Sequence, residues 1–345
     1  MKKELRNTIS RQILKAKISS EDAPRVTLSF YRYVKLAKSP DAKSMVKLRD
    51  QLYEEWTALG VRGRIYLAQE GINAQLDVPQ ENLPALQKNL ESRKKFAAMP
   101  IKIAVEDGRS FIKLTIKVKK QIVADFLPAG SYDVSDVGQH LTPEEFHALL
   151  KEDPDAVAVD VRNRYESRIG HFEGAILPPA DTFREELPMI AKMLRGKEDK
   201  KILLYCTGGI RCEKASSYLK HAGFKNVNQL YGGIIHYAHV TKQKGLKSAF
   251  KGKNFVFDDR LSETITPDVL THCDQCELPC DHYTNCENEM CNRLFIQCQS
   301  CALQFAGCCR AGCQKIAALP LEKRRILRKK QKLSPELFEM RMSPL

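Results

Sequence analysis

The chain has 345 residues, of which 43% are hydrophobic, and it carries a formal net charge of +14 at pH 7. This length predicts two or three domains, and the excess of basic residues favours a polyanionic partner, nucleic acid first, although charge can also serve solubility alone. No apolar run approaches the ~18 residues of a membrane span, and the basic N-terminus lacks the apolar stretch of a secretory signal. The 12 cysteines are therefore expected in a reducing cytoplasm, where metal binding or catalysis is favoured over disulfides.

The first 125 residues are expected to form a ferredoxin-like domain, preceded by a short basic helix around residues 9–18. Alternating residues at 26–34 predict a strand, and a helix then begins near Ser39-Pro40 and ends before Gly60. Two strands joined by Glu70-Gly71, a second helix and another strand are expected at residues 63–68, 73–78, 82–92 and 101–105. The resulting order, βαββαβ, is that of the split ferredoxin-like fold.

A further strand is expected from Phe111 to Val118, where apolar and polar residues alternate. A row of cations can follow a phosphate backbone, so three lysines on its polar side are candidate RNA contacts: Lys113, Lys117 and Lys119. The alternative is a solvated face, or a sheet edge protected against aggregation.

Residues 126–245 are expected to form an α/β domain. A connector at residues 121–139 overlaps its beginning and is expected to pack on it. Thr142 and Glu145 have the spacing of a capping box, which predicts the first helix. Residues 156–161 predict a central strand, and strands and helices alternate from there to about residue 230. This alternation predicts a parallel sheet.

The most informative stretch of this domain joins an apolar strand at residues 201–205 to a helix expected at residues 211–222. Cys206 lies where the strand ends, which is where an open α/β sheet places its ligand site. The adjoining residues are candidate members of an active-site loop: Thr207, Gly208, Gly209, Ile210, Arg211 and Cys212. Glycines let backbone N–H groups point inward and Arg211 adds a fixed charge, so we predict a reactive thiolate at Cys206. The alternative is a buried, unreactive thiol.

Other polar residues near this loop have two interpretations each. Cys212 is either a resolving thiol or a buried helix residue. His171 is either a base for Cys206 or a hydrogen-bonded part of the scaffold. Asp160 and Arg162 lie near a strand end with Glu166, and an ordinary structural ion pair would account for them.

After about Gly245 the sequence is basic and predicts a linker, followed by a cysteine-rich module within residues 246–320. This module contains ten cysteines that are candidate metal ligands, and His282 lies between two of them. The ten are Cys273, Cys276, Cys280, Cys286, Cys291, Cys298, Cys301, Cys308, Cys309 and Cys313. The pairs Cys273-x2-Cys276 and Cys298-x2-Cys301 have zinc-knuckle spacing, so one or two structural zinc ions are expected, with the pairing open. An Fe–S cluster is the alternative because it also uses thiolates. Residues 321–345 form a basic tail, either a helix that docks on RNA or a frayed terminus.

Several segments of the central domain resemble the rhodaneses, which are sulfurtransferases that carry a persulfide on cysteine. Residues 206–211 are similar to the active-site loop of single-domain rhodaneses. Residues 159–163, 170–176 and 230–234 are similar to signatures that flank that loop. The resemblance implies that Asp160 and Arg162 support the loop.

Residues 63–74, the Cys206 loop and the cysteine-rich module together resemble the rhodanese-domain tRNA uridine hydroxylases, over about residues 5–320. This resemblance implies cytoplasmic 5-hydroxylation of the wobble uridine, with molecular oxygen as co-substrate and tRNA as partner. It also implies three modules: an N-terminal ferredoxin-like domain, a central rhodanese-like α/β domain and a C-terminal metal-binding module.

Two other functions stay open on the residues alone. One is a persulfide sulfurtransferase that acts on RNA or a thiol acceptor, and the other is a non-enzymatic RNA-binding protein with a relic rhodanese domain. No sequence motif for oxygen activation is visible, and no protein partner is indicated.

Overall fold

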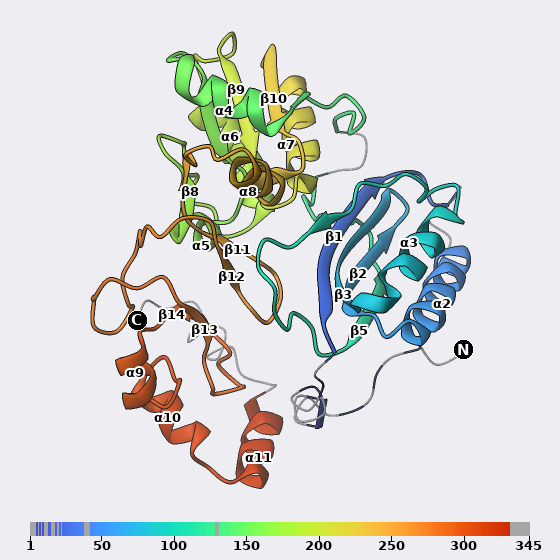
Figure 1. Cartoon of the computed structure of the whole chain (residues 1–345). Coiled ribbons are helices and arrows are strands. Elements are labelled where there is room, and N and C mark those ends of the chain that lie inside the picture. The colour runs from blue at the N-terminus through green and yellow to red at the C-terminus, as the bar shows by residue number, and fades with distance from the viewer. Residues whose placement is uncertain are drawn as a thin grey trace.

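The computed structural model describes residues 23–37, 42–127 and 131–331, together with residues 5, 7, 9, 13, 14, 18 and 21. An N-terminal domain, a central domain and a cysteine-rich C-terminal part follow one another along the chain (Figure 1). The helix expected around residues 9–18 falls for the most part outside the described residues, as does the end of the basic tail, residues 332–345.

The N-terminal domain is a five-stranded sheet with two helices on one face (Figure 1). In the spatial order β4-β1-β3-β2-β5, its strands are β4 (Lys102–Ile103), β1 (Arg25–Tyr33), β3 (Gly71–Pro79), β2 (Arg62–Ala68) and β5 (Leu114–Val118). The first four pair antiparallel, as the βαββαβ pattern predicts, and β5 adds a parallel strand beside β2. The ferredoxin-like expectation is therefore confirmed.

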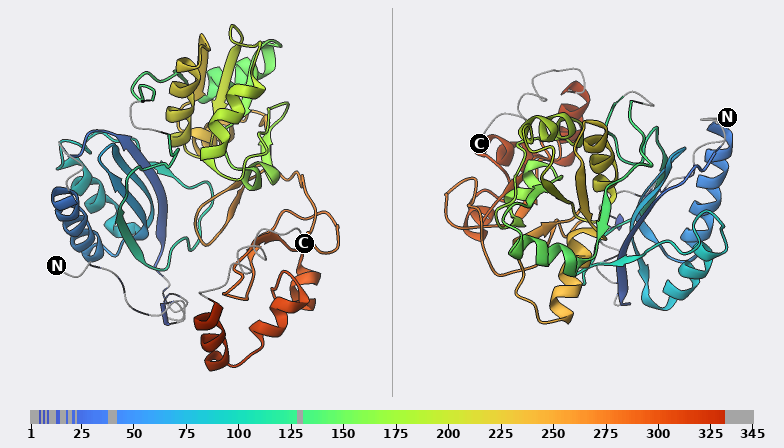
Figure 2. Two further views of the ribbon diagram at one scale, coloured as in Figure 1. Left: turned by 180° about the vertical axis from the view of Figure 1, so that it is seen from behind. Right: turned by 90° about the horizontal axis from the view of Figure 1, so that it is seen from above.

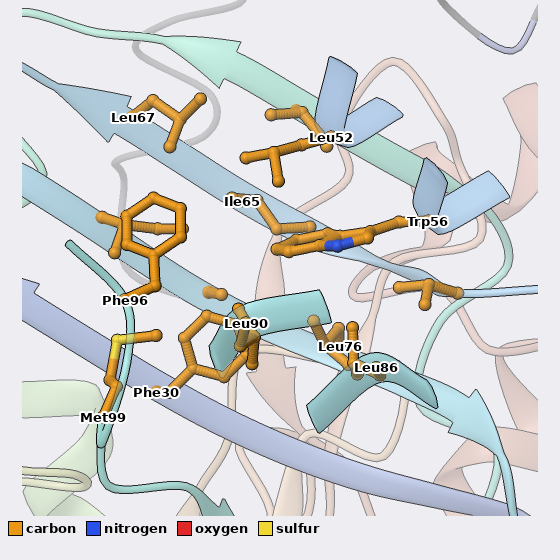
Figure 3. Packing of buried hydrophobic residues seen from close by; sticks show 14 of the residues in the cluster. Phe30, Leu52, Trp56, Ile65, Leu67, Leu76, Leu86, Leu90, Phe96 and Met99 are labelled. Carbon is orange, nitrogen blue, oxygen red and sulfur yellow. The ribbon is translucent and has the colours of Figure 1, made fainter. Parts of the chain in front are cut away.

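The helices α2 (Ala42–Ala58) and α3 (Leu83–Glu91), the latter preceded by the short turn η1 (Gln80–Asn82), cover the apolar face of this sheet. Leu52 and Trp56 lie four residues apart in α2, so both face the sheet and pack on Phe30, Ile65 and Leu76 (Figure 3). This core leaves the alternate residues of β1, β2 and β3 on the opposite face, toward the central domain (Figure 1).

Two strands are shorter than the sequence pattern predicts. β4 comprises only two residues, and β5 begins at Leu114 because Phe111 donates its N–H to the carboxylate of Asp77 at 3.0 Å instead of pairing with β2.

The central domain contains a four-stranded parallel sheet, as expected. In the order β6-β10-β9-β7, its strands are β6 (Gln139–Leu141), β10 (Asn226–Leu230), β9 (Lys201–Tyr205) and β7 (Val157–Asp160). The helices that pack around it are α4 (Pro143–Glu152), α5 (Arg164–Arg168), α6 (Phe183–Met193), α7 (Ile210–His221) and α8 (Gly233–Gln243). The capping box at Thr142 and Glu145 begins α4 as predicted.

The prediction that residues 156–161 form a central strand is wrong, because β7 lies at the edge of its sheet. Beyond β7 there is a single bridge, from Val159 to Ile176. The segment around Ile176 covers this edge of the sheet. It therefore buries the apolar residues of 156–161, whose pattern had predicted a strand in the middle of the sheet.

The prediction of a linker after Gly245 is also wrong. This segment contains β11 (Phe250–Phe255), the middle strand of a three-stranded sheet with β8 (Gly170–Phe172) and β12 (Ser262–Thr264). Buried residues alternate along β11 with half-buried lysines, and the lysines concealed this period of two. The β11–β12 hairpin extends between the central and N-terminal domains (Figure 2).

The cysteine-rich part has little regular structure. It contains the hairpin β13 (Tyr283–Asn285) and β14 (Leu294–Ile296), followed by the helices α9 (Gln299–Gln304), α10 (Ala311–Ala317) and the basic helix α11 (Leu321–Gln331). Among the described residues, no helix combines the length and apolar character needed to cross a membrane.

Candidate active site and metal clusters

Cys206 follows β9 directly, at the carboxyl edge of the parallel sheet, and α7 begins at Ile210. Gly209 precedes α7 with a φ of 97°, a conformation that favours glycine, and donates its N–H to the Cys206 sulfur at 3.1 Å. The N–H groups of Arg211 and Cys212 also point at this sulfur. The loop is therefore a ring of donors around a buried sulfur at a helix N-terminus, an arrangement that stabilises an anion.

The surroundings of Cys206 favour its thiolate. Burial alone would raise the pKa of Cys206, but the Cys212 thiol, the charge of Arg211 and the backbone N–H groups together lower it to about 5. Burial and the neighbouring Cys206 raise the pKa of Cys212 well above its usual range. At neutral pH, Cys206 is therefore ionised, and Cys212 is the protonated thiol that donates a hydrogen bond to it.

Arg211 is held in place by a buried carboxylate. Its two terminal nitrogens donate to the two carboxylate oxygens of Glu166 in α5, with 2.8 Å between Nη2 and Oε2. The Thr207 hydroxyl donates to the same Oε2 at 3.4 Å. Glu166, which the sequence placed only near a strand end, thus fixes the charge beside Cys206.

Asp160 and Arg162 form a fully buried ion pair, with distances of 2.9 Å from Nε to Oδ1 and 2.7 Å from Nη2 to Oδ2. Arg162 also donates to the carbonyl of Gly170 in β8 at 2.6 Å. Within the described chain neither side chain bonds directly to residues 206–212. Both contact the side chain of Tyr205, the residue before the loop: Asp160 hydrogen-bonds to it, and its ring centroid lies 5.8 Å from Arg162 Cζ.

His171 lies in β8, where its Nδ1 is 2.9 Å from the carbonyl oxygen of Ser167. This hydrogen bond is to the scaffold. In the part of the chain that the structure covers, His171 has no hydrogen bond to Cys206.

A pocket of about 350 Å³ adjoins the Cys206 loop, and all three parts of the chain contribute to it. The loop supplies Cys206 and Arg211, among others. The C-terminal part supplies residues 256–258, Arg260 and Glu263. The N-terminal sheet supplies polar residues from four strands: Ser29, Tyr31, Arg64, Tyr66, Asn73, Gln75 and Lys102.

Tyr31 joins the two larger domains beside this pocket. Its hydroxyl donates to Glu213 of α7 at 2.9 Å, and Glu213 also lies 3.0 Å from His140 Nε2. The Lys102 ammonium lies 4.5 Å from the centroid of the Tyr31 ring. Burial lowers the pKa of Lys102 to about 8, and the negative charges of Cys206 and Glu213 oppose this decrease.

Eight of the ten candidate metal ligands gather in two groups of four thiols. In each group the sulfur atoms all lie within 4.8 Å of one another; the groups are Cys273, Cys276, Cys298 and Cys301, and Cys286, Cys291, Cys309 and Cys313. Pairs of cysteines alternate between the groups along the chain, so the two clusters are interleaved. All 12 cysteines of the chain are free. Four neighbouring thiols can bind a tetrahedral zinc ion, and they can also hold an Fe–S cluster.

Cys280 and Cys308 belong to neither group, contrary to the expectation that all ten cysteines are ligands, and His282 is also outside both. Cys308 is buried, and its carbonyl oxygen accepts a hydrogen bond from Gln275. Thiolate clusters need four ligands each, and the eight grouped sulfurs supply them.

Comparisons with known proteins agree with this architecture. Family models match residues 25–122 (UPF0176 acylphosphatase-like domain), 142–238 (rhodanese-like domain) and 251–314 (rhodanese C-terminal). A Leptospira interrogans protein named tRNA uridine(34) hydroxylase is 54% identical over 98% of this chain and 94% of its own length. Proteins of the same name from Salmonella schwarzengrund and Sodalis glossinidius are 50% and 48% identical, over 92% and 93% of this chain and 89% and 90% of theirs. The chain belongs to the tRNA uridine(34) hydroxylase family.

Two solved structures of rhodanese type are similar to about a third of the chain. A rhodanese-like domain protein from Staphylococcus aureus is 25% identical, covering 29% of this chain and 90% of its own, with a TM-score of 0.25. A thiosulfate sulfurtransferase from Pseudomonas aeruginosa is 24% identical, covering 33% and 20%, with a TM-score of 0.28. These scores are too low to add to the argument.

Sequence reasoning missed the residues that other elements bring to the hydroxylase-family loop. Lys102 and Tyr31 come from the N-terminal sheet, and Phe257, over whose ring the Arg211 guanidinium lies at 5.7 Å, comes from the segment after β11. No local motif marks them, because only the packing of three separate parts places them together. The period-two alternation of β1 predicted the strand, and it is the one signal that could have placed Tyr31 on the face opposite the core.

Proposed function

We propose that this protein hydroxylates C5 of the wobble uridine of tRNA, in the cytoplasm, with molecular oxygen as the source of the added atom. The observation that carries the proposal is a low-pKa thiolate at Cys206, in a pocket shared with an N-terminal sheet, in a chain of the tRNA uridine(34) hydroxylase family. The net charge of +14 supports a tRNA partner.

Cys206 acts as the nucleophile. Its sulfur forms a bond to C6 of the uracil ring, and the electrons of the C5–C6 double bond move toward C5 and O4, which gives an enolate. The charge of Arg211 and the loop N–H groups keep the sulfur ionised before this step. The enolate makes C5 electron-rich, so C5 forms a bond to dioxygen and becomes a hydroperoxide. Two external thiols then reduce the O–O bond, which leaves a hydroxyl group on C5, releases water and joins the thiols as a disulfide. Loss of the C5 proton and departure of the thiolate then restore the ring.

The overall reaction needs a reductant. Uridine, dioxygen, two electrons and two protons give 5-hydroxyuridine and water, and oxidation of two external thiols to a disulfide supplies the electrons and protons. The wobble uridine is already unpaired in the anticodon loop, so its entry into a pocket costs little.

The two clusters of four thiols are proposed to hold one zinc ion each. Zinc in such sites is structural and supplies folding energy to a module with little apolar core. The clusters lie in the C-terminal part, and none of their cysteines lines the Cys206 pocket. Zinc therefore has no part in the proposed oxygen chemistry.

The test is a reaction of the purified protein with unmodified tRNA, a thiol reductant and air, followed by mass spectrometry of the nucleosides. One added oxygen at the wobble uridine is expected with the parent protein, and none with Cys206→Ser. A product that carries sulfur instead would assign the protein to the sulfurtransferases, and a Cys206→Ser variant with full activity would contradict the nucleophilic role.

A further inference from the structure

The polar face of the N-terminal sheet carries two rows of side chains that run across its strands. The strand register aligns Lys102, Ser29, Gln75 and Arg64 in one row. It aligns Tyr31, Asn73, Tyr66 and Lys117 in the next row. Residues in one row project from the same face of a sheet, so the rows form one continuous polar and aromatic surface.

This surface faces Cys206. Seven of the eight residues, all but Lys117, line the pocket that Cys206 also lines. Their sequence neighbours Phe30, Ile65 and Leu76 point the other way, into the core beneath α2 and α3 (Figure 3). The sheet is therefore one wall of the pocket, and the Cys206 loop is the opposite wall.

Several side chains of this wall have polar groups with no hydrogen-bond or ion-pair partner among the described residues. Among the described residues, no hydrogen bond or ion pair engages the Gln75 amide, the Arg64 guanidinium or the Tyr66 hydroxyl. Two neighbours in the rows are already used: the Asn73 amide donates to the Ile122 carbonyl at 3.2 Å, and Tyr31 binds Glu213. The Ser29 hydroxyl on β1 and the Lys102 ammonium, which lies over the Tyr31 ring, have no such bond within the described chain either. Gln75, Arg64 and Tyr66 differ from these two because they lie together on the adjacent strands β3 and β2.

We propose that Gln75, together with Arg64, reads the edge of the target base, and that Tyr66 stacks on a nucleotide of the bound RNA. This rests on the proposed function, since it takes uracil as the base that meets Cys206. The edge of uracil presents an acceptor, a donor and an acceptor, namely O4, N3–H and O2. A carboxamide offers one donor beside one acceptor, and the neighbouring guanidinium offers only donors.

Gln75 and Arg64 together distinguish uracil from cytosine, which neither side chain does alone. An amide alone can rotate to suit either uracil or cytosine, because each has a donor beside an acceptor on this edge. Cytosine, however, carries an amino group in the place of O4, and a donor-only guanidinium rejects it. Sheet aromatics that stack on bases are a common means of binding single-stranded RNA.

The charge around Tyr66 suits the RNA backbone. The Lys119 ammonium lies 5.6 Å from the centroid of the Tyr66 ring, and the exposed Lys117 is the register neighbour of Tyr66 on β5. A base stacked on Tyr66 would place its phosphate near these lysines, two of the three that the sequence marked as candidate RNA contacts.

The experiment measures the affinity of anticodon stem-loop RNA for Cys206→Ser protein, with uridine or cytidine at the wobble position. Because no reaction occurs in this background, the result does not depend on the oxygen chemistry. We expect the parent background to prefer the uridine RNA and Gln75→Leu to bind it roughly 5- to 150-fold more weakly, the range for a lost bidentate base contact. Gln75→Glu should bind the uridine RNA more weakly than the parent background does, because a carboxylate has no donor for uracil and repels its acceptor oxygens. The matched control is Gln51→Leu, an exposed glutamine on α2 beyond the opposite face of the sheet.

Stacking is tested separately. Tyr66→Ala should weaken both RNAs by roughly 5- to 150-fold, and Tyr66→Phe should restore most of that loss because it keeps the ring. Equal binding of uridine and cytidine RNA by the parent background, or an unchanged preference in Gln75→Leu, would overturn the assignment of Gln75. In the oxygenation assay, full activity of Gln75→Leu would do the same and would leave the proposed function standing.

Discussion

At the scale of single residues, the central feature is the thiolate of Cys206, which is buried from solvent. Burial opposes ionisation of Cys206, so its low pKa depends on the Cys212 thiol, the charge of Arg211 and the convergent N–H groups of the loop. Arg211 itself is positioned by Glu166, which makes that carboxylate part of the same electrostatic device. Cys212 is explained as a hydrogen-bond donor, and its raised pKa does not favour a second nucleophile.

The pH dependence of alkylation tests this arrangement. The thiolate is the reactive form, so labelling of Cys206 by iodoacetamide should rise through a midpoint near pH 5 and be constant above it, whereas an ordinary thiol titrates at about 8.5. Cys212→Ala removes a donor to the thiolate and should move the midpoint upward. Peptide mass spectrometry at each pH gives the rate for Cys206 alone. A midpoint above pH 8 in the parent would show that the loop does not stabilise the anion.

At the scale of elements, the loop between β9 and α7 depends on one glycine more than on the other. Gly209 has a φ of 97°, and a Cβ at this position would lie 2.8 Å from the Tyr31 hydroxyl oxygen. Gly208 has no positive φ, and a Cβ there would meet nothing within 4 Å. The same loop thus contains a required glycine and a tolerant one.

Gly209→Ala should therefore lower the free energy of unfolding by about 1–2 kcal/mol, the cost of a left-handed conformation at a residue with a Cβ. It should also raise the alkylation midpoint of Cys206, because the Gly209 N–H moves away from the sulfur. Gly208→Ala is the matched control, with unfolding close to the parent in denaturant titrations. Equal effects of the two substitutions would contradict the geometry of the loop.

The cysteine-rich module makes a second prediction at this scale. Elemental analysis of protein purified without chelator should find two zinc ions per chain, and Cys273→Ser or Cys313→Ser should each reduce this by about one or cause the module to unfold. Cys280→Ser, outside both clusters, should leave two. If the analysis finds iron and the protein absorbs visible light, the module holds an Fe–S cluster and not zinc. If Cys280→Ser loses as much metal as Cys273→Ser, the division of the cysteines into these two groups is wrong.

At the scale of the whole molecule, a buried lysine joins the domains that form the pocket. Lys214 of α7 lies 3.2 Å from Glu70 of the N-terminal domain and 3.0 Å from Asp125 of the connector, and it donates to the Val123 carbonyl at 2.9 Å. Its side chain is 1% exposed. Lys214 is therefore a buried cation that links the N-terminal domain and the connector to α7, beside the Tyr31–Glu213 hydrogen bond.

Lys214→Ala should destabilise the protein by about 3–5 kcal/mol, because it leaves two carboxylates at the interface without a cation. It should also expose the connector at residues 121–127 to protease and reduce turnover. The matched control is Lys220→Ala. Lys220 lies on the same helix as Lys214 and forms an exposed ion pair with Asp136, so its loss should lower the free energy of unfolding by less than about 1 kcal/mol. The same protease resistance in both variants would mean that Lys214 does not hold the interface.

The sequence predicted what is local and missed what is assembled from distant segments. The strand-loop-helix at Cys206, the capping box at Thr142 and the βαββαβ order are short-range patterns, and each matches the structure. β11 was missed because its lysine-rich composition is typical of a linker, although the lysines alternate with buried residues. The Cys-x2-Cys spacing indicated metal ligands, but the division of the cysteines into two groups depends on contacts between residues far apart in sequence. The contribution of Gln75 to the Cys206 pocket depends on such contacts too.

We propose that the protein transfers oxygen from dioxygen to the wobble uridine by means of Cys206. The most direct measurement is the reaction with unmodified tRNA and a thiol reductant under oxygen-18 gas in ordinary water, with the mass of the wobble nucleoside as readout. We expect 5-hydroxyuridine that carries oxygen-18, formed only by protein that retains Cys206. A hydroxyl group labelled from oxygen-18 water instead of the gas, or a product that carries sulfur, would contradict it.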